Sequence, residues 1–323
     1  MDARATIVTL TPNPAVDQMV WLEGLELGRV NRLLATQLDP AGKGINAARV
    51  AHRLGWPTRA FGFAGGETGA MLERLLELEG VEHDFVQIPG RTRFNTTIVA
   101  CRTWTSLRGV GPDIAPEHLD ELERRVCAAL GPGRVLVMAG SLPPGVPTDC
   151  YARFVRAAKR RGATVLLDAA GEPLSLGVAE RPDLIKPNVP EAEGLLGRRL
   201  SGIEEVSQGA RELVRRGVGT VVVSMGAEGA IVARGAQLWR VRPPRVERKS
   251  TVGSGDSMVA GLAVGFAAGK RLEEGIALAT AAGAATAMTP GTARGTAAAI
   301  GALLPAVRVE ELVAHRLHLP ASS

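Results

Sequence analysis

The chain has 323 residues, 46% of them hydrophobic and 22% charged, which is enough apolar material for a large core and too apolar for extensive disorder. Aromatic residues make up only 3% of the chain, and the formal net charge of +5 comes from scattered basic pairs rather than from one long basic run. This composition argues against a basic nucleic-acid arm and against an aromatic platform for single-stranded nucleic acid.

Cysteine usage and hydropathy indicate a cytoplasmic protein that binds no membrane. The three cysteines, Cys101, Cys127 and Cys150, lie far apart and lack metal-ligand spacing, as expected for reduced thiols. The first residues lack the apolar core of a secretion signal. The uncharged stretch 275–293 is mostly Ala, Gly and Thr and contains Pro290, so we expect a buried helix and then a turn rather than a membrane span.

Strands and helices are predicted to alternate along most of the chain. Short β-branched runs predict strands at 7–10, 59–63, 135–139, 164–168, 184–186 and 220–224. Helical periodicity predicts helices at 44–54, 69–79, 116–130, 148–161, 189–196 and 204–216. Such alternation predicts an α/β protein with a mostly parallel central sheet and helices on both of its faces.

Two regions interrupt this alternation. Residues 16–38 and 85–107 contain strand-like runs without a convincing helix. If they pair into one small sheet at the carboxyl edge of the main sheet, where ligands of α/β folds bind, they would form a lid that excludes water from a reacting group. Two ordinary surface hairpins are the alternative. Because a small isolated sheet has open edges and an apolar face to cover, the lid also predicts a homodimer.

The N-terminal third carries two candidate ligand sites. Asp17 follows the first strand after a turn that contains two prolines, so its carboxylate could accept hydrogen bonds from sugar hydroxyls or could simply cap the turn. Further on, Gly42 and Gly44 surround Lys43 at the start of a predicted helix, with Asn46 close behind. Glycine and lysine at a helix start favour an anion site, although the spacing is not that of a Walker A loop.

Further polar residues follow other predicted strands. Arg93 opens a strand-like run and could grip a phosphate in a bidentate manner. Ser141 follows the strand at 135–139. Asn188 and Glu191 have the spacing of a helix capping box, and alternatively could hold water molecules bound to Mg²⁺, which prefers oxygen ligands. Residues 224–229 form a glycine-containing turn that suits a nucleotide.

The most informative motif is the run 250–258, in which Gly253, Ser254 and Gly255 precede Asp256 at the start of a predicted helix. Glycines let backbone N–H groups approach a ligand, and a helix N-terminus attracts anions. An aspartate has an ordinary pKa of about 3.9, so it is ionised at neutral pH and can take a proton from a hydroxyl held beside the anion. An anion site with a base predicts phosphoryl transfer to an alcohol, and a capped turn is the alternative.

All of these motifs lie at predicted carboxyl ends of strands or in the two lid-like regions, as a single binding crevice would require. Together they resemble the ribokinase-like family of carbohydrate kinases, and within it the phosphosugar kinase branch. The likeness runs from about residue 7 to residue 312 and rests on the run 250–258 together with Lys186-Pro187-Asn188 and Asn13-Pro14. Residues 41–46 and 90–95 are most similar to those of kinases that act on fructose 1-phosphate.

The resemblance implies a fold and a set of roles. The chain would be a single ribokinase-like domain over residues 1–323, with a three-layer α/β/α arrangement and a lid sheet formed by about 16–38 and 85–107. Asp256 would be the base, and the backbone amides of Gly253, Ser254 and Gly255 would form the anion hole. The substrate-binding residues would be Asp17, Gly42, Lys43, Gly44, Asn46, Arg93 and Ser141, with Arg29 of the lid serving the same site or that of a partner subunit. The nucleotide-binding residues would be Lys186, Asn188, Ser224, Gly226, Gly229, Thr251, Thr280, Gly283 and Ala287.

The cofactors implied are ATP, Mg²⁺ and, as in many relatives, a monovalent cation such as K⁺. Asn188 and Glu191 would hold Mg²⁺ through water. Backbone near Ser250, Val252 and Gly291 would hold the monovalent cation. One position departs from the family pattern, because Ser254 stands where alanine is usual. Its hydroxyl could add a hydrogen bond to the phosphate or crowd the loop.

The activity implied is transfer of a phosphoryl group from ATP to fructose 1-phosphate, which gives fructose 1,6-bisphosphate and ADP. Fructose 6-phosphate and tagatose 6-phosphate are alternative acceptors, because the three sugars differ mainly in where their hydroxyls and phosphate lie. A non-catalytic sugar-phosphate sensor that kept the fold is the alternative of another class. The expected partners are a phosphorylated ketohexose and a second copy of the chain, with neither nucleic acid nor membrane.

Overall fold

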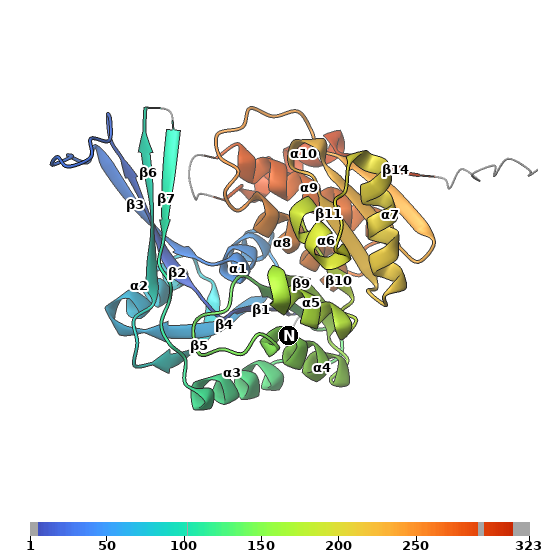
Figure 1. Cartoon of the computed structure of the whole chain (residues 1–323), viewed down its shortest axis with the longest axis horizontal. Helices are drawn as coiled ribbons and strands as arrows, with labels where there is room; N and C mark the ends of the chain where they lie inside the picture. The colour runs from blue at the N-terminus through green and yellow to red at the C-terminus, as the bar shows by residue number, and fades with distance from the viewer. Residues whose placement is uncertain (1–5, 102, 290–293, 313–323) are drawn as a thin grey trace, which may run out of the picture.

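A computed structural model describes residues 6–101, 103–289 and 294–312. The described residues form a sheet of ten strands and a second sheet of four (Figure 1). The strands of the larger sheet are β1 (Ile7–Thr11), β4 (Thr58–Gly65), β5 (Glu82–Ile88), β8 (Val135–Ala139), β9 (Thr164–Asp168), β10 (Leu184–Ile185), β11 (Thr220–Ser224), β12 (Ala230–Arg234), β13 (Gln237–Arg242) and β14 (Arg308–Glu311). They lie in the order β14-β13-β12-β11-β10-β9-β8-β1-β4-β5.

The larger sheet is parallel over most of its width. From β11 to β5 every neighbouring pair in the described chain is parallel, whereas β12, β13 and β14 continue the sheet as antiparallel strands. All six predicted strands are present, and three of them have the predicted bounds. The prediction missed β5 and the antiparallel edge, and β10 ends one residue earlier than predicted. The mostly parallel α/β sheet is therefore confirmed.

Helices cover both faces of the larger sheet. One face carries α1 (Lys43–Arg53), α2 (Gly66–Leu78), α8 (Ser254–Ala267), α9 (Leu272–Ala287) and the short α10 (Ala297–Leu303). The other face carries α3 (Pro116–Ala128), α4 (Cys150–Arg160), α5 (Gly171–Ala179), α6 (Val189–Leu196) and α7 (Gly202–Arg215). The three-layer arrangement is thus as expected, and α5 and α10 are additions to the predicted helices.

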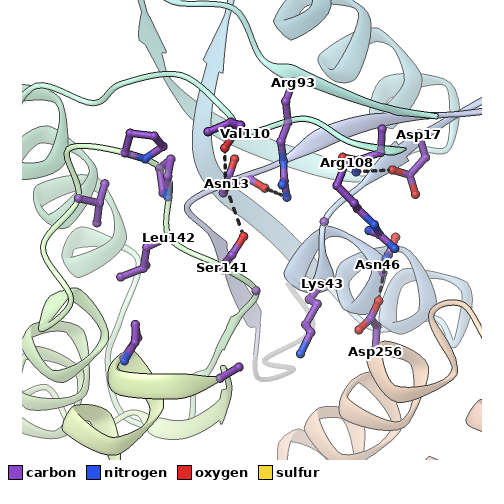
Figure 2. Close-up of a pocket in the computed structure, with 18 of the residues that line it drawn as sticks. Asn13, Asp17, Lys43, Asn46, Arg93, Arg108, Val110, Ser141, Leu142 and Asp256 are labelled. Atoms are coloured by element: carbon purple, nitrogen blue, oxygen red, sulfur yellow. Dashed lines mark hydrogen bonds between the residues drawn. The ribbon is translucent and has the colours of Figure 1, made fainter. Parts of the chain in front are cut away.

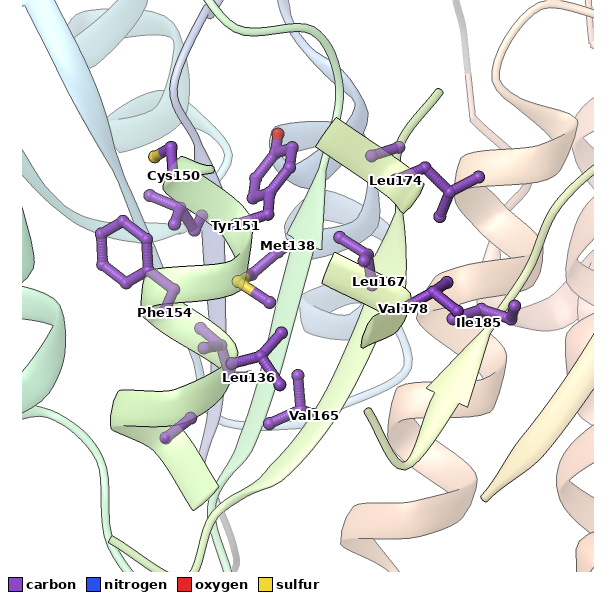
Figure 3. Close-up of a cluster of buried hydrophobic side chains, with 14 of the residues drawn as sticks. Leu136, Met138, Cys150, Tyr151, Phe154, Val165, Leu167, Leu174, Val178 and Ile185 are labelled. Atoms are coloured by element: carbon purple, nitrogen blue, oxygen red, sulfur yellow. The ribbon is translucent and has the colours of Figure 1, made fainter. Parts of the chain in front are cut away.

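Side chains along each central strand point alternately to the two faces of the larger sheet, so each strand contributes to the hydrophobic core on either face. In β8, Leu136 and Met138 face α4 and α5, where they contact the cluster that includes Tyr151 and Phe154 (Figure 3). Val137 points to the opposite face, toward α1 and α8. Removing such a side chain from water contributes about 1.5–3 kcal/mol. A strand that is apolar on both faces belongs at the centre of a parallel sheet.

The uncharged C-terminal stretch forms a buried helix, as predicted. In α9 most residues from Gly275 onward are buried, and the helix packs closely on α8 because a side chain at Gly261 would meet the Cα of Ala279 at 2.4 Å. None of the described helices combines the length and hydropathy that crossing a bilayer requires. The turn predicted after α9 falls partly on residues 290–293, outside the described residues.

The second sheet, which we call the lid sheet, consists of β2 (Ala15–Trp21), β3 (Ala35–Ala41), β6 (Arg93–Ala100) and β7 (Thr103–Arg108), in the order β3-β2-β6-β7. It projects from one end of the larger sheet (Figure 1). The sequence-based boundary at residue 85 was wrong, because residues 85–88 belong to β5 of the larger sheet. There Phe85, Val86 and Ile88 are buried against neighbouring helices, and this burial outweighs the resemblance of the segment to a surface hairpin.

Candidate active site

Two neighbouring cavities open at the carboxyl edge of the larger sheet. The first has a volume of about 920 Å³ and is lined from the lid sheet, the start of α1 and the ends of β1 and β8. The second has a volume of about 500 Å³ and lies between the residues after β11 and helices α8 and α9. The start of α8 separates them, because Gly253 and Asp256 line the first cavity whereas Ser254 and Gly255 line the second.

Asp256 occupies the first turn of α8 and is only 9% exposed. Its carboxylate accepts a hydrogen bond of 2.7 Å from Nδ2 of Asn46 on α1 (Figure 2). Burial raises the pKa of Asp256 above 3.8, and the negative charge of Asp168 adds to this, while Arg294, the Asn46 hydrogen bond and Lys43 oppose it. A raised pKa makes the carboxylate a stronger base, so Asp256 is suited to accept a proton from an alcohol in the first cavity.

Both helices at the site begin with a glycine that no other residue replaces easily. Gly42 caps α1 with φ of 127°, and a Cβ there would lie 2.6 Å from Cγ2 of Thr11. Gly253 caps α8 with φ of 76°. These glycines bring two helix N-termini to the cavities, where backbone N–H groups favour anions.

A buried carboxylate that the sequence analysis missed links two predicted site residues. Asp168 ends β9 and is 2% exposed. Its Oδ1 lies 3.3 Å from Nζ of Lys43 and 3.6 Å from Nζ of Lys186. Burial acts to lower the pKa of Lys43, but Asp168, Glu191 and Asp256 together raise it, so the ammonium stays charged at neutral pH. Lys186 itself lies beside Gly255, where a Cβ would be 3.5 Å from its Nζ.

Arg93 lines the first cavity, but much of its guanidinium is already engaged. It donates to the carbonyl oxygens of Asn13 at 2.8 Å, Gly109 at 3.0 Å and Pro14 at 3.4 Å. Burial lowers the pKa of Arg93, and the nearby positive charge of Arg108 lowers it further. Arg93 thus holds the turn after β1 in place and keeps only part of its donor set for a phosphate.

Two more cavity residues come from the lid sheet and were also missed. Asn95 donates to Oδ1 of Asp17 at 2.8 Å, which orients the predicted sugar-binding carboxylate. Arg108 pairs with Asn95 across β6 and β7 and lies near Asp17 and Asn46 (Figure 2). The sequence signal that could have identified Arg108 as a cavity residue was its position directly before Gly109, just after the strand-like region 85–107. Arg108 gives the cavity a cation beside Arg93 and Lys43.

Some buried polar atoms at both cavities have no hydrogen-bond partner within the described part of the chain. In the first cavity these are Oδ1 of Asn13 and Oδ1 of Asn46, and in the second they are Oγ of Ser254 and Oγ1 of Thr280. A buried polar atom without a partner costs about 1–3 kcal/mol, so such atoms mark places where a ligand supplies hydrogen bonds.

The structure gathers nearly all predicted nucleotide residues around the second cavity. Its lining includes Asn188, Ser224, Gly226, Gly229, Thr251, Thr280, Gly283 and Ala287. Lys186 does not line it. Arg245 and Arg248 also line this cavity and were not predicted, because they lie in an irregular segment with no motif of its own. Two arginines, two helix faces and unpartnered hydroxyls suit a phosphorylated, partly apolar ligand such as a nucleotide.

Asn188 and Glu191 form a capping box at the start of α6. Oδ1 of Asn188 accepts from the N–H of Glu191, and Oε2 of Glu191 accepts from the N–H of Asn188, each at 2.9 Å. The remaining Oε1 of Glu191 is 4.0 Å from Nζ of Lys43. Capping leaves lone pairs free on these oxygens, so the pair fits the outer shell of a hydrated Mg²⁺. In the described ranges no three His, Cys, Asp or Glu residues gather as a direct metal-binding group.

Other predicted residues lie elsewhere or only partly at the site. Ser141 and Asp17 line the first cavity, but Arg29 is exposed in the segment between β2 and β3 and lines neither cavity of its own chain. Gly44 is buried, where a Cβ would meet Oγ1 of Thr11 at 2.5 Å, so it serves the packing of α1 on β1. Ser250 and Val252 lie just before α8, whereas Gly291 lies outside the described residues.

Comparison with known proteins gives consistent results. A family model described as pfkB family carbohydrate kinase matches residues 11–299. The 1-phosphofructokinase of Rhodobacter capsulatus is 40% identical over 85% of this chain and 88% of its own. A tagatose-6-phosphate kinase of Staphylococcus epidermidis is 35% identical over 80% of this chain and 85% of its own. The crystal structure of phosphofructokinase-2 from Escherichia coli in complex with potassium has a TM-score of 0.90 and 32% identity, and covers 94% of this chain and 99% of that one.

Proposed function

The chain belongs to the pfkB family of carbohydrate kinases, and from this we propose that it transfers the terminal phosphoryl group of ATP to fructose 1-phosphate. It is a phosphosugar kinase, a phosphotransferase with an alcohol as acceptor. The observation that carries the proposal is Asp256 at the start of α8, between a cavity rich in cations and amides and a second cavity suited to a nucleotide.

In the proposed reaction the sugar phosphate occupies the first cavity. Lys43, Arg93 and Arg108 attract its phosphate, while Asp17 and Asn46 accept or donate hydrogen bonds to its hydroxyls. Asn95 supports this arrangement because its side chain holds Asp17 in place at 2.8 Å. The bound sugar then presents one hydroxyl to Asp256 at the entrance to the second cavity.

The nucleotide occupies the second cavity with its phosphates at the start of α8. Asp256 takes the proton of the acceptor hydroxyl as the oxygen forms its bond to phosphorus, and ADP leaves. The backbone N–H groups of Gly253, Ser254 and Gly255 stabilise the transferring group, and Lys186 adds a positive charge beside Gly255. Mg²⁺, once bound near Asn188 and Glu191, would neutralise phosphate charge.

Fructose 1-phosphate is the proposed acceptor because the 40% identical relative is a 1-phosphofructokinase. A second candidate is tagatose 6-phosphate, since a tagatose-6-phosphate kinase is 35% identical over most of its length. The proposed cofactors are ATP, Mg²⁺ and a monovalent cation near Ser250 and Val252. The three free cysteines of the chain support a cytoplasmic location.

The test is a coupled assay of ADP release with fructose 1-phosphate, fructose 6-phosphate and tagatose 6-phosphate under identical conditions. We expect kcat/KM for fructose 1-phosphate to exceed both other values at least tenfold. A higher value for another sugar would overturn the acceptor but leave the kinase assignment. If all three sugars bind by calorimetry and none yields ADP, the protein is a sensor rather than a kinase.

We also propose that the chain is one kinase domain that dimerises through the lid sheet. Trp21, Val99 and Trp104 are paired across β2, β6 and β7, and each lies four residues along its strand from Asp17, Asn95 or Arg108. Residues four apart on a strand share a face, so this apolar row continues the face that lines the first cavity. Trp104 is 61% exposed, and a partner's lid sheet would cover it and shield the cavity from water.

A further inference from the structure

A buried arginine lies directly behind the start of α8. Arg294 is only 3% exposed. Its guanidinium packs against Gly253, because a Cβ at that glycine would lie 2.6 Å from Cζ and 2.7 Å from Nη1 of Arg294. Arg294 is not among the described residues that line the two cavities. Arg294 can therefore affect the reaction only by acting on the residues at the start of α8, and not by direct contact with a ligand in either cavity.

A chain of buried hydrogen bonds ties the same segment to the anion loop. The N–H of Gly295 donates to Oγ1 of Thr286 at 3.1 Å, the hydroxyls of Thr286 and Ser257 are 2.7 Å apart, and Ser257 donates to the carbonyl of Gly253 at 3.0 Å. Because the hydroxyl of Ser257 donates its proton to the carbonyl of Gly253, it must accept in its contact with Thr286, and the hydroxyl of Thr286 is the donor there. All donors thus point the same way, which strengthens each bond.

The other side of the segment is held by α1. Nη1 of Arg53 donates to the carbonyl oxygen of Arg294 at 3.0 Å. The backbone that carries Arg294 is therefore attached to α9 and α8 on one side and to α1 on the other. The segment is thus held at two places, the Arg294 carbonyl and the N–H of Gly295, and only the second continues through hydrogen bonds to Gly253.

The charges around Arg294 are mixed. Burial lowers the pKa of Arg294 to about 10, and the negative charge of Asp256 opposes this lowering. The positive charge of Arg49 on α1 lowers the pKa further. The negative charges of Asp17 and Asp39 in the lid sheet raise it, more weakly than Asp256 does. Arg294 therefore remains a cation at neutral pH. Among the groups that keep the Asp256 carboxylate ionised against the effect of burial, Arg294 is the strongest.

We propose that Arg294 is a positioning residue of the phosphoryl-transfer site, whose guanidinium holds the anion loop at Gly253 and keeps Asp256 in its charged, proton-accepting form. This inference rests on the proposed kinase function. It gives the site a fixed internal cation that lines neither cavity. The other titratable groups that influence Asp256 are Lys43 at the start of α1 and Asp168 at the end of β9.

The principal test is Arg294→Met, which keeps a long side chain and removes the charge. Without the cation the pKa of Asp256 rises further, so the acid limb of kcat/KM against pH should move upward by about one unit. Below the shifted limb kcat should fall by up to about tenfold, and the loss should vanish at pH values well above it. The KM for the sugar phosphate should change less than twofold, because Arg294 lines neither cavity.

Two further variants separate the charge from structure. Arg53→Met removes the bond to the Arg294 carbonyl but leaves the guanidinium, and its acid limb should match that of the parent. Arg294→Lys keeps the charge, so its acid limb should also stay in place. Its kcat should fall several-fold, because an ammonium cannot pack flat against Gly253. Circular dichroism and thermal unfolding establish that each variant is folded.

The outcomes are distinct. If the parent is active and the pH profile of Arg294→Met superimposes on that of the parent, the inference is refuted. It is also refuted if the acid limb of Arg53→Met shifts as far as that of Arg294→Met. If Arg294→Met does not fold, an Arg294→Lys variant with the kcat of the parent overturns it instead. A parent that releases no ADP with any phosphoketose refutes the proposed function, which is a different result.

Discussion

At the scale of single residues, Asp256 combines two opposing demands. A base for phosphoryl transfer must be shielded from water, yet burial disfavours the ionised form that accepts the proton. Asn46 at 2.7 Å and the positive charges of Lys43 and Arg294 oppose the effect of burial without cancelling it. The catalytic position is therefore one at which the fold is less stable than it could be.

Asp256→Asn tests the base directly. The amide oxygen can still accept from Asn46, but the residue can no longer take a proton. We expect kcat to fall by about 10² to 10⁴ while the KM values for both substrates stay within a few-fold. Steady-state kinetics with the preferred sugar measure this, and near-normal turnover in the variant would contradict the role of Asp256.

The same variant should be more stable than the parent at neutral pH. The pKa of Asp256 is raised on folding, so between its unfolded value of about 3.9 and the folded value the native state binds more protons. Stability from this residue is full below about pH 3.9 and is lost as pH rises through the folded pKa. Asp256→Asn should therefore unfold at a higher temperature at pH 7, and the gain should shrink as pH falls. Equal melting temperatures at pH 7 would count against the raised pKa.

At the scale of secondary-structure elements, the site depends on where α1 and α8 begin. Each starts at a glycine of positive φ, and each places a charged side chain of the site, Lys43 or Asp256, within its first turn. The two helices pack against each other, so a shift of either start would separate Asn46 from Asp256.

Gly42→Ala should disturb the start of α1. A Cβ at this position meets Thr11 and the backbone has φ of 127°, so we expect a loss of about 1–3 kcal/mol in the free energy of unfolding. The KM for the sugar phosphate should rise as well. The matched control is Gly55→Ala, at φ of 77° with open space around it. Urea denaturation compares the two, and a Gly42→Ala protein as stable as Gly55→Ala would show that the contact with Thr11 is easily relieved.

At the scale of the whole molecule, the lid sheet leaves apolar surface uncovered. Trp104 is 61% exposed on the face that carries the apolar row, and Leu38, Phe94 and Leu107 are 37%, 40% and 56% exposed on the opposite face. Arg29 also lies in this region, in the segment between β2 and β3, away from the cavities of its own chain. An interface between two lid sheets would cover the apolar row and is the arrangement in which Arg29 could approach the cavity of a partner.

Trp104→Glu should break the proposed dimer. A charge in the apolar row would be desolvated on association, which costs several kcal/mol. We expect sedimentation at micromolar concentration to give a dimer for the parent and a monomer for the variant, with a higher KM for the sugar. Leu78→Glu, at an equally exposed site on α2, is the control and should remain dimeric. A parent that is monomeric would refute dimerisation through the lid.

The amino-acid sequence by itself determined the layered α/β fold, the family and most of the cavity residues. Alternating apolar runs specify strands and helices locally, and α6, β8, β9 and β11 were predicted with their observed bounds for this reason. Motifs such as Lys186 to Glu191 are also local, because a capping box needs only residues three apart.

Only the tertiary structure decided which distant residues complete the site. Asp168 became visible as the partner of Lys43 and Lys186, and Asn46 as the partner of Asp256, only once separate elements were packed together. Arg294 lies in a segment without a motif, and its place against Gly253 follows from the docking of that segment on α1, α8 and α9. Such contacts join residues far apart in the chain, and no local pattern of propensity or spacing records them.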